Sequence, residues 1–124
     1  MFRRPRCLSA RDRDWYRQTV VDDWRTCAQA HGDAAIAACT QVIEYGGPPP
    51  KIRAIAYFNR GAAYHAKGDL DRALADFNEV IRLDPKLAAV AYYNRGLARR
   101  EKGGTVGANA DIAEARELQP GIGQ

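Results

Sequence analysis

Apolar residues between positions 54 and 84 fall into two runs with the spacing of amphipathic helices, separated by Gly68 and Asp69. The runs comprise Ala56, Phe58, Ala63 and Tyr64, and then Leu70, Ala73, Leu74, Phe77, Val80 and Ile81. Gly68 can adopt the left-handed conformation that ends a helix, and Asp69 can cap the next helix. The pattern therefore predicts a hairpin of two helices, which Pro85 closes because proline cannot continue a helix.

This hairpin pattern repeats along the chain. Residues 57–61 (Tyr-Phe-Asn-Arg-Gly) recur as residues 92–96 (Tyr-Tyr-Asn-Arg-Gly), an offset of 35. A weaker copy precedes them, because residues 33–43 align with residues 71–81 at an offset of 38. We expect three helical hairpins, over about 14–45, 52–84 and 88–119, with the Gly-Gly-Pro-Pro-Pro run at 46–50 linking the first two.

Composition indicates one folded domain with a basic end. Hydrophobic residues make up 46% of the chain and charged residues 27%, which is ordinary for a globular protein. The net charge of +4 resides in residues 1–13, where arginines outnumber the single aspartate, and the rest of the chain is formally neutral. We expect a basic tail over 1–13, a folded domain over 14–120 and a short C-terminal tail over 121–124.

The sequence shows no pattern of a membrane span or of a secretory signal. No apolar run approaches the ~20 residues that cross a bilayer, and the N-terminal stretch lacks an apolar signal core. As written, the chain is expected to be soluble and cytoplasmic. If the natural translation start lies upstream, we expect a periplasmic or exported protein instead.

The side chains that carry chemistry are scattered. No serine, threonine or cysteine stands in a nucleophile motif, and the two histidines, His31 and His65, lie in different hairpins. Metal-ligand spacings such as CxxC or HxxxH are absent from the sequence, as is a glycine-rich phosphate loop. We therefore expect no enzyme, no metal site and no cofactor.

The repeated residues resemble the tetratricopeptide repeat family, and in particular small bacterial proteins with three such repeats. The resemblance is carried best by the second hairpin, through Tyr57, Gly61, Tyr64, Gly68, Ala73, Phe77 and Pro85. It implies an all-α fold, a right-handed α-solenoid of about three helix-turn-helix hairpins. It also implies a protein-binding adaptor or scaffold that holds an extended segment of another protein in a concave groove.

In the resembled family, the asparagine of the Tyr-x-Asn-x-Gly stretch often binds the backbone of a peptide in this groove. Asn59 and Asn94 occupy that place. Helical spacing adds neighbours on the same side of each first helix, so the predicted groove residues are Asn59, Asn94, Phe58, Tyr93, His65, Leu97 and Arg100. For Phe58 and Tyr93, packing between hairpins is an equally good interpretation.

A clamp for a terminal carboxylate, known in some members of the family, fits this chain poorly. The equivalent face of the first helix carries Thr19, Asp22 and Asp23, and the two aspartates would repel a carboxylate. Arg60 and Arg100 lie further along and could attract one.

Cys27 and Cys39 stand on the two helices of the first hairpin, so their side chains can meet. Similar bacterial repeat proteins carry cysteines in this arrangement, which implies a disulfide. The alternative is a pair of small buried thiols that fill an alanine-rich hairpin.

Two other functions stay open at this point. One is a self-associating structural module, because an exposed end of the hairpin stack could pair with a second copy. The arginine-rich tail could make weak contacts with nucleic acid or an anionic surface.

Overall fold

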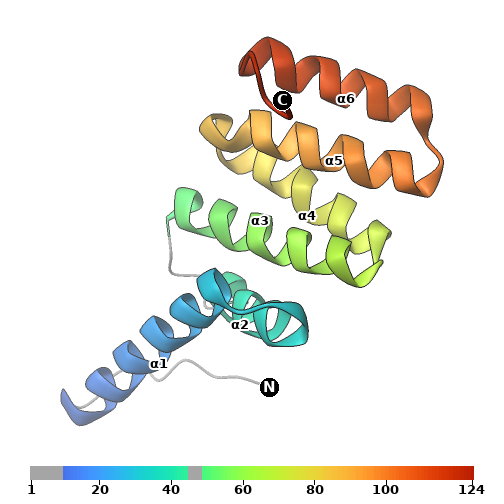
Figure 1. Cartoon of the computed structure of the whole chain (residues 1–124). Coiled ribbons are helices and arrows are strands. Elements are labelled where there is room, and N and C mark those ends of the chain that lie inside the picture. The colour runs from blue at the N-terminus through green and yellow to red at the C-terminus, as the bar shows by residue number, and fades with distance from the viewer. Residues whose placement is uncertain (1–9, 45–48) are drawn as a thin grey trace.

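A computed structural model describes residues 10–44 and 49–124, with side chains from Gln18 onward apart from Val20. The described residues form helices and turns and no strands. The helices are α1 (Ala10–Gln29), α2 (Gly32–Glu44), α3 (Pro50–Lys67), α4 (Leu70–Leu83), α5 (Ala88–Lys102) and α6 (Thr105–Leu118), with a short 3-10 turn, η1 (Pro85–Leu87), before α5 (Figure 1).

The helices pair as three hairpins that stack in chain order. Within each hairpin the first helix packs on the second, and each second helix also packs on the first helix of the next hairpin, α2 on α3 and α4 on α5 (Figure 1). Each hairpin thus contacts its neighbours in the sequence. The predicted all-α repeat solenoid is confirmed.

The predicted helix ends are confirmed as well. Gly68 and Gly103 end α3 and α5 in the left-handed conformation, with φ of 86° and 98°. Asp69 caps α4, because its carboxylate accepts a hydrogen bond from the backbone N–H of Arg72 at 3.3 Å. At the other end of α4, the carboxylate of Asp84 accepts from the N–H of Lys86 at 2.9 Å and so starts η1.

Two expected segments fall partly outside the described residues. These are the basic tail over 1–13, of which residues 1–9 are not described, and the proline-rich run over 46–50, of which residues 46–48 are not described. Helix α1 begins at Ala10, ahead of the expected start at residue 14.

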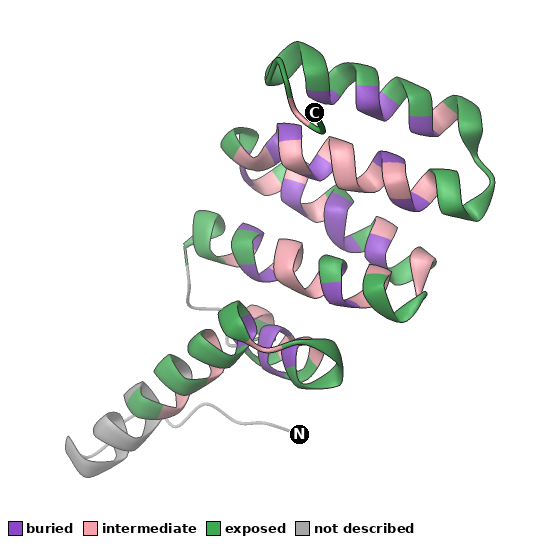
Figure 2. Cartoon of the chain, in the orientation of Figure 1, coloured by how far each residue is buried: buried purple, intermediate pink, exposed green. Residues whose placement is uncertain are grey.

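Alanine dominates the interior of the stack. Buried residues lie along the inner sides of the paired helices (Figure 2), and the largest fully buried side chains are those of Phe77 and Val80. The buried alanines include Ala54, Ala56, Ala73, Ala91, Ala98, Ala108 and Ala115. Small side chains allow the helix backbones to approach closely, so most of the packing energy comes from many short contacts.

The closest approach is at Gly96, where α5 crosses α6. A Cβ placed on Gly96 would lie 2.9 Å from Cγ1 of Ile112 and 3.0 Å from the carbonyl oxygen of Ala108. The backbone atom cannot move aside as a side chain would. We expect Gly96→Ala to lower the free energy of unfolding by about 1–3 kcal/mol in urea titrations, the usual cost of overpacking.

Gly107 in α6 provides the matched control. A Cβ there would meet its nearest neighbour, Cδ of Arg99, at an ordinary 3.4 Å. Gly107→Ala should therefore stabilise the protein by roughly 0.5–1 kcal/mol, because alanine is the better helix former. Equal effects of the two substitutions would show that the close crossing at Gly96 is not what selects glycine.

Candidate interaction face

An arginine at the centre of α3 ties three helices together. Arg60 donates from Nε and Nη2 to the two carboxylate oxygens of Asp76 in α4, at 2.8 and 2.7 Å, and from Nη1 to Oγ1 of Thr40 in α2, at 3.1 Å. Its guanidinium lies 5.3 Å from the ring centroid of Tyr57. Arg60 therefore joins the first hairpin to the second and is not available to attract a carboxylate ligand.

The third hairpin repeats this arrangement. Arg95 donates to both carboxylate oxygens of Asp111, at 3.0 and 2.7 Å, and reaches back to Oδ1 of Asn78 in α4 at 2.8 Å. Arg99 adds a third donor to Asp111 at 2.8 Å. The two aspartates are each only 3% exposed, so each needs its arginine partner.

The pKa values of Asp76 and Arg60 are both shifted within this pair. Loss of solvation raises the pKa of Asp76, although the hydrogen bonds from Arg60 oppose the shift. The hydrogen bonds to Asp76 raise the pKa of Arg60 in turn. The pair is thus a buried structural element whose carboxylate is costly to ionise without its partner.

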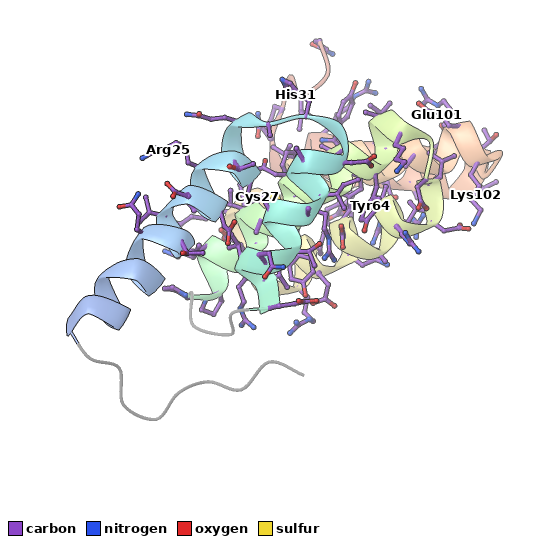
Figure 3. The ribbon with its side chains drawn as sticks, turned by 90° about the horizontal axis from the view of Figure 1, so that it is seen from below. Arg25, Cys27, His31, Tyr64, Glu101 and Lys102 are labelled. Atoms are coloured by element: carbon purple, nitrogen blue, oxygen red, sulfur yellow. A yellow bond between two sulfur atoms is a disulfide. The ribbon has the colours of Figure 1, made fainter. Side chains whose placement is uncertain are left out.

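Two ion pairs and one histidine–carboxylate contact also bridge neighbouring hairpins at the turn ends of the helices. Lys67 in α3 contacts Asp33 in α2 at 2.6 Å, and Lys102 in α5 contacts Asp71 in α4. His65 in α3 lies 2.9 Å from Glu101 in α5. Figure 3 shows Glu101 and Lys102 together at this end of α5. These exposed pairs help to set the spacing of the first helices, although each alone contributes little stability.

The first helices present one nearly uncharged face, which we call the first-helix face. On α3 its residues recur every three or four positions and so lie along one side of the helix. The residues 35 positions later form a second stripe on η1 and α5. Both stripes are exposed or half-buried. They consist of Ile52, Ile55, Asn59, Ala62 and Ala66, and of Leu87, Val90, Asn94, Leu97 and Glu101.

Helix α1 extends this face at the offset of 38, through exposed Val21 and Ala28 and half-buried Trp24. Helix α3 contacts both α1 and α5, so the stripes lie side by side. Together they form an apolar surface with two amides near its centre.

The two predicted asparagines differ in their surroundings. Nδ2 of Asn94 donates to the carbonyl of Val90 one turn earlier, at 2.9 Å, so one of its donors is used within α5. Asn59 makes no hydrogen bond within the described residues, and its side chain lines a hollow beside α1. Asn59 thus retains both a donor and an acceptor for a partner.

This hollow has a volume of about 240 Å³ and lies between the end of α1, the α1–α2 turn and α3. In Figure 3, Cys27 lies where α1 approaches α2, and His31 lies in the turn between them. Its walls consist of Cys27, Ala28, Ala30, His31, Gly32, Asn59, Ala62, Ala63 and Ala66. A ligand group can enter this hollow from the first-helix face.

The remaining predicted groove residues lie around this face in different settings. Phe58 packs on Phe77 with ring centroids 5.9 Å apart, and His65 is paired with Glu101 as described above. A Cβ on Gly123 would lie 2.5 Å from the Tyr93 ring, so the segment after α6 covers this tyrosine. Leu97 is half-buried in the α5 stripe and Arg100 is exposed. The structure therefore brings Asn59 and Leu97 onto the face and places Phe58, His65 and Tyr93 against other parts of the chain.

The buried aspartates and the hollow are features that the sequence interpretation missed. A signal for the aspartates was present, because Asp76 and Asp111 each follow the arginine of the Asn-Arg-Gly stretch by 16 residues, once in each copy. Nothing in the sequence pattern indicated the hollow, since its walls are mostly alanine.

The two cysteines of the first hairpin lie together in the interior. A disulfide joins Cys27 in α1 to Cys39 in α2, with their Cα atoms 4.6 Å apart, and both residues are buried. Cys39 aligns with Phe77, the largest buried side chain of the second hairpin, at the offset of 38. The bridge thus stands where the other hairpins have a large apolar side chain.

Comparison with known proteins agrees with this architecture. The family model of the tetratricopeptide repeat matches residues 54–87, which span α3, α4 and η1. Residues 54–87 thus form a tetratricopeptide repeat, and the stack of helical hairpins around them supports a protein of this family. A search of curated proteins and a search of solved structures each returned no match.

Tetratricopeptide repeats are a non-catalytic fold for protein interaction, so the matched repeat supports a protein–protein interaction module, with protein partners, in general. None of the helices in the described ranges has the length and apolar character needed to cross a membrane.

Proposed function

We propose that the protein is an adaptor that holds an extended segment of a partner protein on its first-helix face. The observation that carries this proposal is the pair of parallel stripes on α3 and α5, which keep apolar residues at the surface and carry an asparagine at the same position. Surface-exposed apolar stripes are costly in a protein that leaves them uncovered. An extended segment laid across them buries this surface.

Main-chain recognition follows from the amides. Asn59 has both a donor and an acceptor available, and Asn94 retains its carbonyl oxygen. A partner segment crossing α3 and α5 can therefore form hydrogen bonds to its peptide groups at two points one hairpin apart. Such contacts hold a backbone without reading its sequence, so selectivity rests on the apolar positions beside them.

Asn59→Ala tests this proposal. Peptides of twelve residues would be selected from a random phage-displayed library on the wild-type protein, and their affinities measured by fluorescence polarisation. We expect Asn59→Ala to weaken binding by about tenfold, since two hydrogen bonds are lost. The matched control is Asn109→Ala, the same substitution at an exposed position of α6.

The control variant should bind the selected peptides as the wild type does. If Asn59→Ala also binds unchanged while circular dichroism shows it folded, the first-helix face is not where these peptides bind.

A further inference from the structure

The first hairpin lacks the buried arginine–aspartate pair that fastens the other two. At the offset of 38, Asp22 stands in place of Arg60, and Ala38 stands in place of Asp76. The contact between α1 and α2 must therefore be secured by other means. The only covalent link across the described helices is the disulfide between Cys27 and Cys39.

The same disulfide forms part of the hollow. Cys27 lines it directly, and the residues that follow Cys27 on α1 and in the turn build the rest of that wall. The opposite wall belongs to α3. Because the disulfide fixes the last turn of α1 on α2, and α2 packs on α3, it sets the distance between the two walls.

The chemistry of the walls restricts what can enter. Five of the nine lining residues are alanines, and none of the nine carries a carboxylate, an ammonium or a guanidinium group. The one ionisable side chain among them is the imidazole of His31. A cationic side chain placed there would lose its hydration without gaining a counter-charge, and a carboxylate would exchange its hydration for walls that are mostly alanine. The volume of about 240 Å³ exceeds the roughly 150 Å³ of an apolar cavity that takes up benzene. One aliphatic side chain fits.

We propose that this hollow takes one uncharged aliphatic side chain of the segment bound on the first-helix face, and that the Cys27–Cys39 disulfide holds its α1 wall in place. The inference rests on the proposed function. Asn59 lines the hollow, so its amide can bind the main chain next to the inserted side chain. The hollow thereby supplies the selectivity that the asparagines lack.

The first test fills the hollow. The probe is a peptide selected on the wild-type protein from the random library, and the variant is Ala66→Phe, which places a ring in the hollow and leaves Asn59 intact. We expect peptide affinity to fall at least tenfold. The control is Ala110→Phe, at an exposed position of α6, which should bind as the wild type does. Within the peptide, one aliphatic position should tolerate leucine, isoleucine, valine or methionine and reject aspartate.

The second test removes the disulfide that holds the α1 wall of the hollow. Cys27→Ala/Cys39→Ala should weaken binding of the same peptide at least tenfold at a temperature where circular dichroism shows the variant folded. Ala115→Gly is the control for lowered stability, because it weakens helix α6, which contributes no residue to the first-helix face or to the hollow. Its affinity for the peptide should stay at the wild-type value.

The outcomes separate this inference from the proposed function. If Asn59→Ala weakens binding but Ala66→Phe does not, the face binds peptides and the hollow is not a subsite. If neither variant weakens binding, the proposed function itself fails. If the cysteine double variant binds as tightly as the wild type, the disulfide does not hold the wall.

Discussion

Arg60→Met is expected to lower the free energy of unfolding by about 3–5 kcal/mol at neutral pH, the usual result of breaking a buried ion pair on one side. Both carboxylate oxygens of Asp76 accept hydrogen bonds from Arg60, and Asp76 is buried. Without the guanidinium, a charged group stays in the interior with no counter-ion. Urea unfolding followed by circular dichroism would measure the loss.

The loss of unfolding free energy in Arg60→Met should depend on pH in a defined direction. Burial raises the pKa of Asp76, and removal of Arg60 raises this pKa further because the opposing hydrogen bonds are gone. A carboxyl group whose pKa is higher in the folded chain than in the unfolded chain stabilises the fold when protonated. This contribution is lost as the pH rises through the folded-state pKa. The variant should therefore be furthest below wild type at neutral pH, and the gap should narrow toward mildly acidic pH.

Two controls identify the cause. In the double variant Arg60→Met/Asp76→Leu the buried charge is removed as well, so most of the lost stability should return. Arg82→Met removes an arginine whose pair with Glu79 is solvent-exposed, and its unfolding curve should match that of the wild type. A double variant as unstable as the single one would show that packing of the arginine stem, and not its charge, is what counts.

Four polar contacts between hairpins share a direction, while the contact of His65 with the carboxylate of Glu101 runs the other way. The second helix of the first hairpin offers acceptors, Asp33 and Thr40, to the lysine and arginine of the second hairpin. In turn α4 offers Asp71 and Asn78 to the third hairpin. The second and third hairpins are therefore each held by acceptors of the preceding one.

Helix α6 does not continue this series. At the offset of 35, Val106 replaces Asp71 and Ala113 replaces Asn78, so both acceptors are lost, and Val106 is 85% exposed. The half-buried Leu74 and Ile81 of α4 become the exposed Asn109 and Arg116. The outer face of α6 is thus more polar than that of α4 at these two positions, while Val106 and Leu118 are exposed apolar residues on it.

Much of the fold could be predicted because local signals and the repeat agree. Gly68 and Asp69 end one helix and start the next by their own conformational and hydrogen-bonding preferences, and Pro85 closes the unit. The same signals recur at a fixed offset. Such information is local, so the hairpins can be located without knowing how they pack.

The interaction face was harder to predict because it depends on the rotation of each helix against its neighbours. Phe58 is one position away from Asn59, which is a turn of about 100° around the helix. That difference places Phe58 against Phe77 and Asn59 in the hollow. In the sequence, the alanines that line the hollow follow the same hydrophobic pattern as alanines of the buried core. The hollow is therefore visible only once the packing of α1 on α3 is known.

Removal of the disulfide is expected to lower the free energy of unfolding by about 3 kcal/mol in the chain-entropy description, because Cys27 and Cys39 are separated by 12 residues. The first hairpin should respond most, since it has no buried arginine–aspartate pair to compensate. The measurement compares urea unfolding of the wild type with that of Cys27→Ala/Cys39→Ala, each with and without a thiol reductant. Reductant should destabilise the wild type and leave the double variant unchanged.

A count of free thiols tests for the disulfide without a measurement of stability. The chain has three cysteines, so unreduced, denatured wild-type protein should show one reactive thiol, that of Cys7. Three reactive thiols, together with an unfolding curve that reductant does not shift, would mean that the two buried cysteines of the first hairpin are free. In that case α1 would be held to α2 by packing alone, and the first hairpin should be the first part of the stack to exchange its amide hydrogens with solvent.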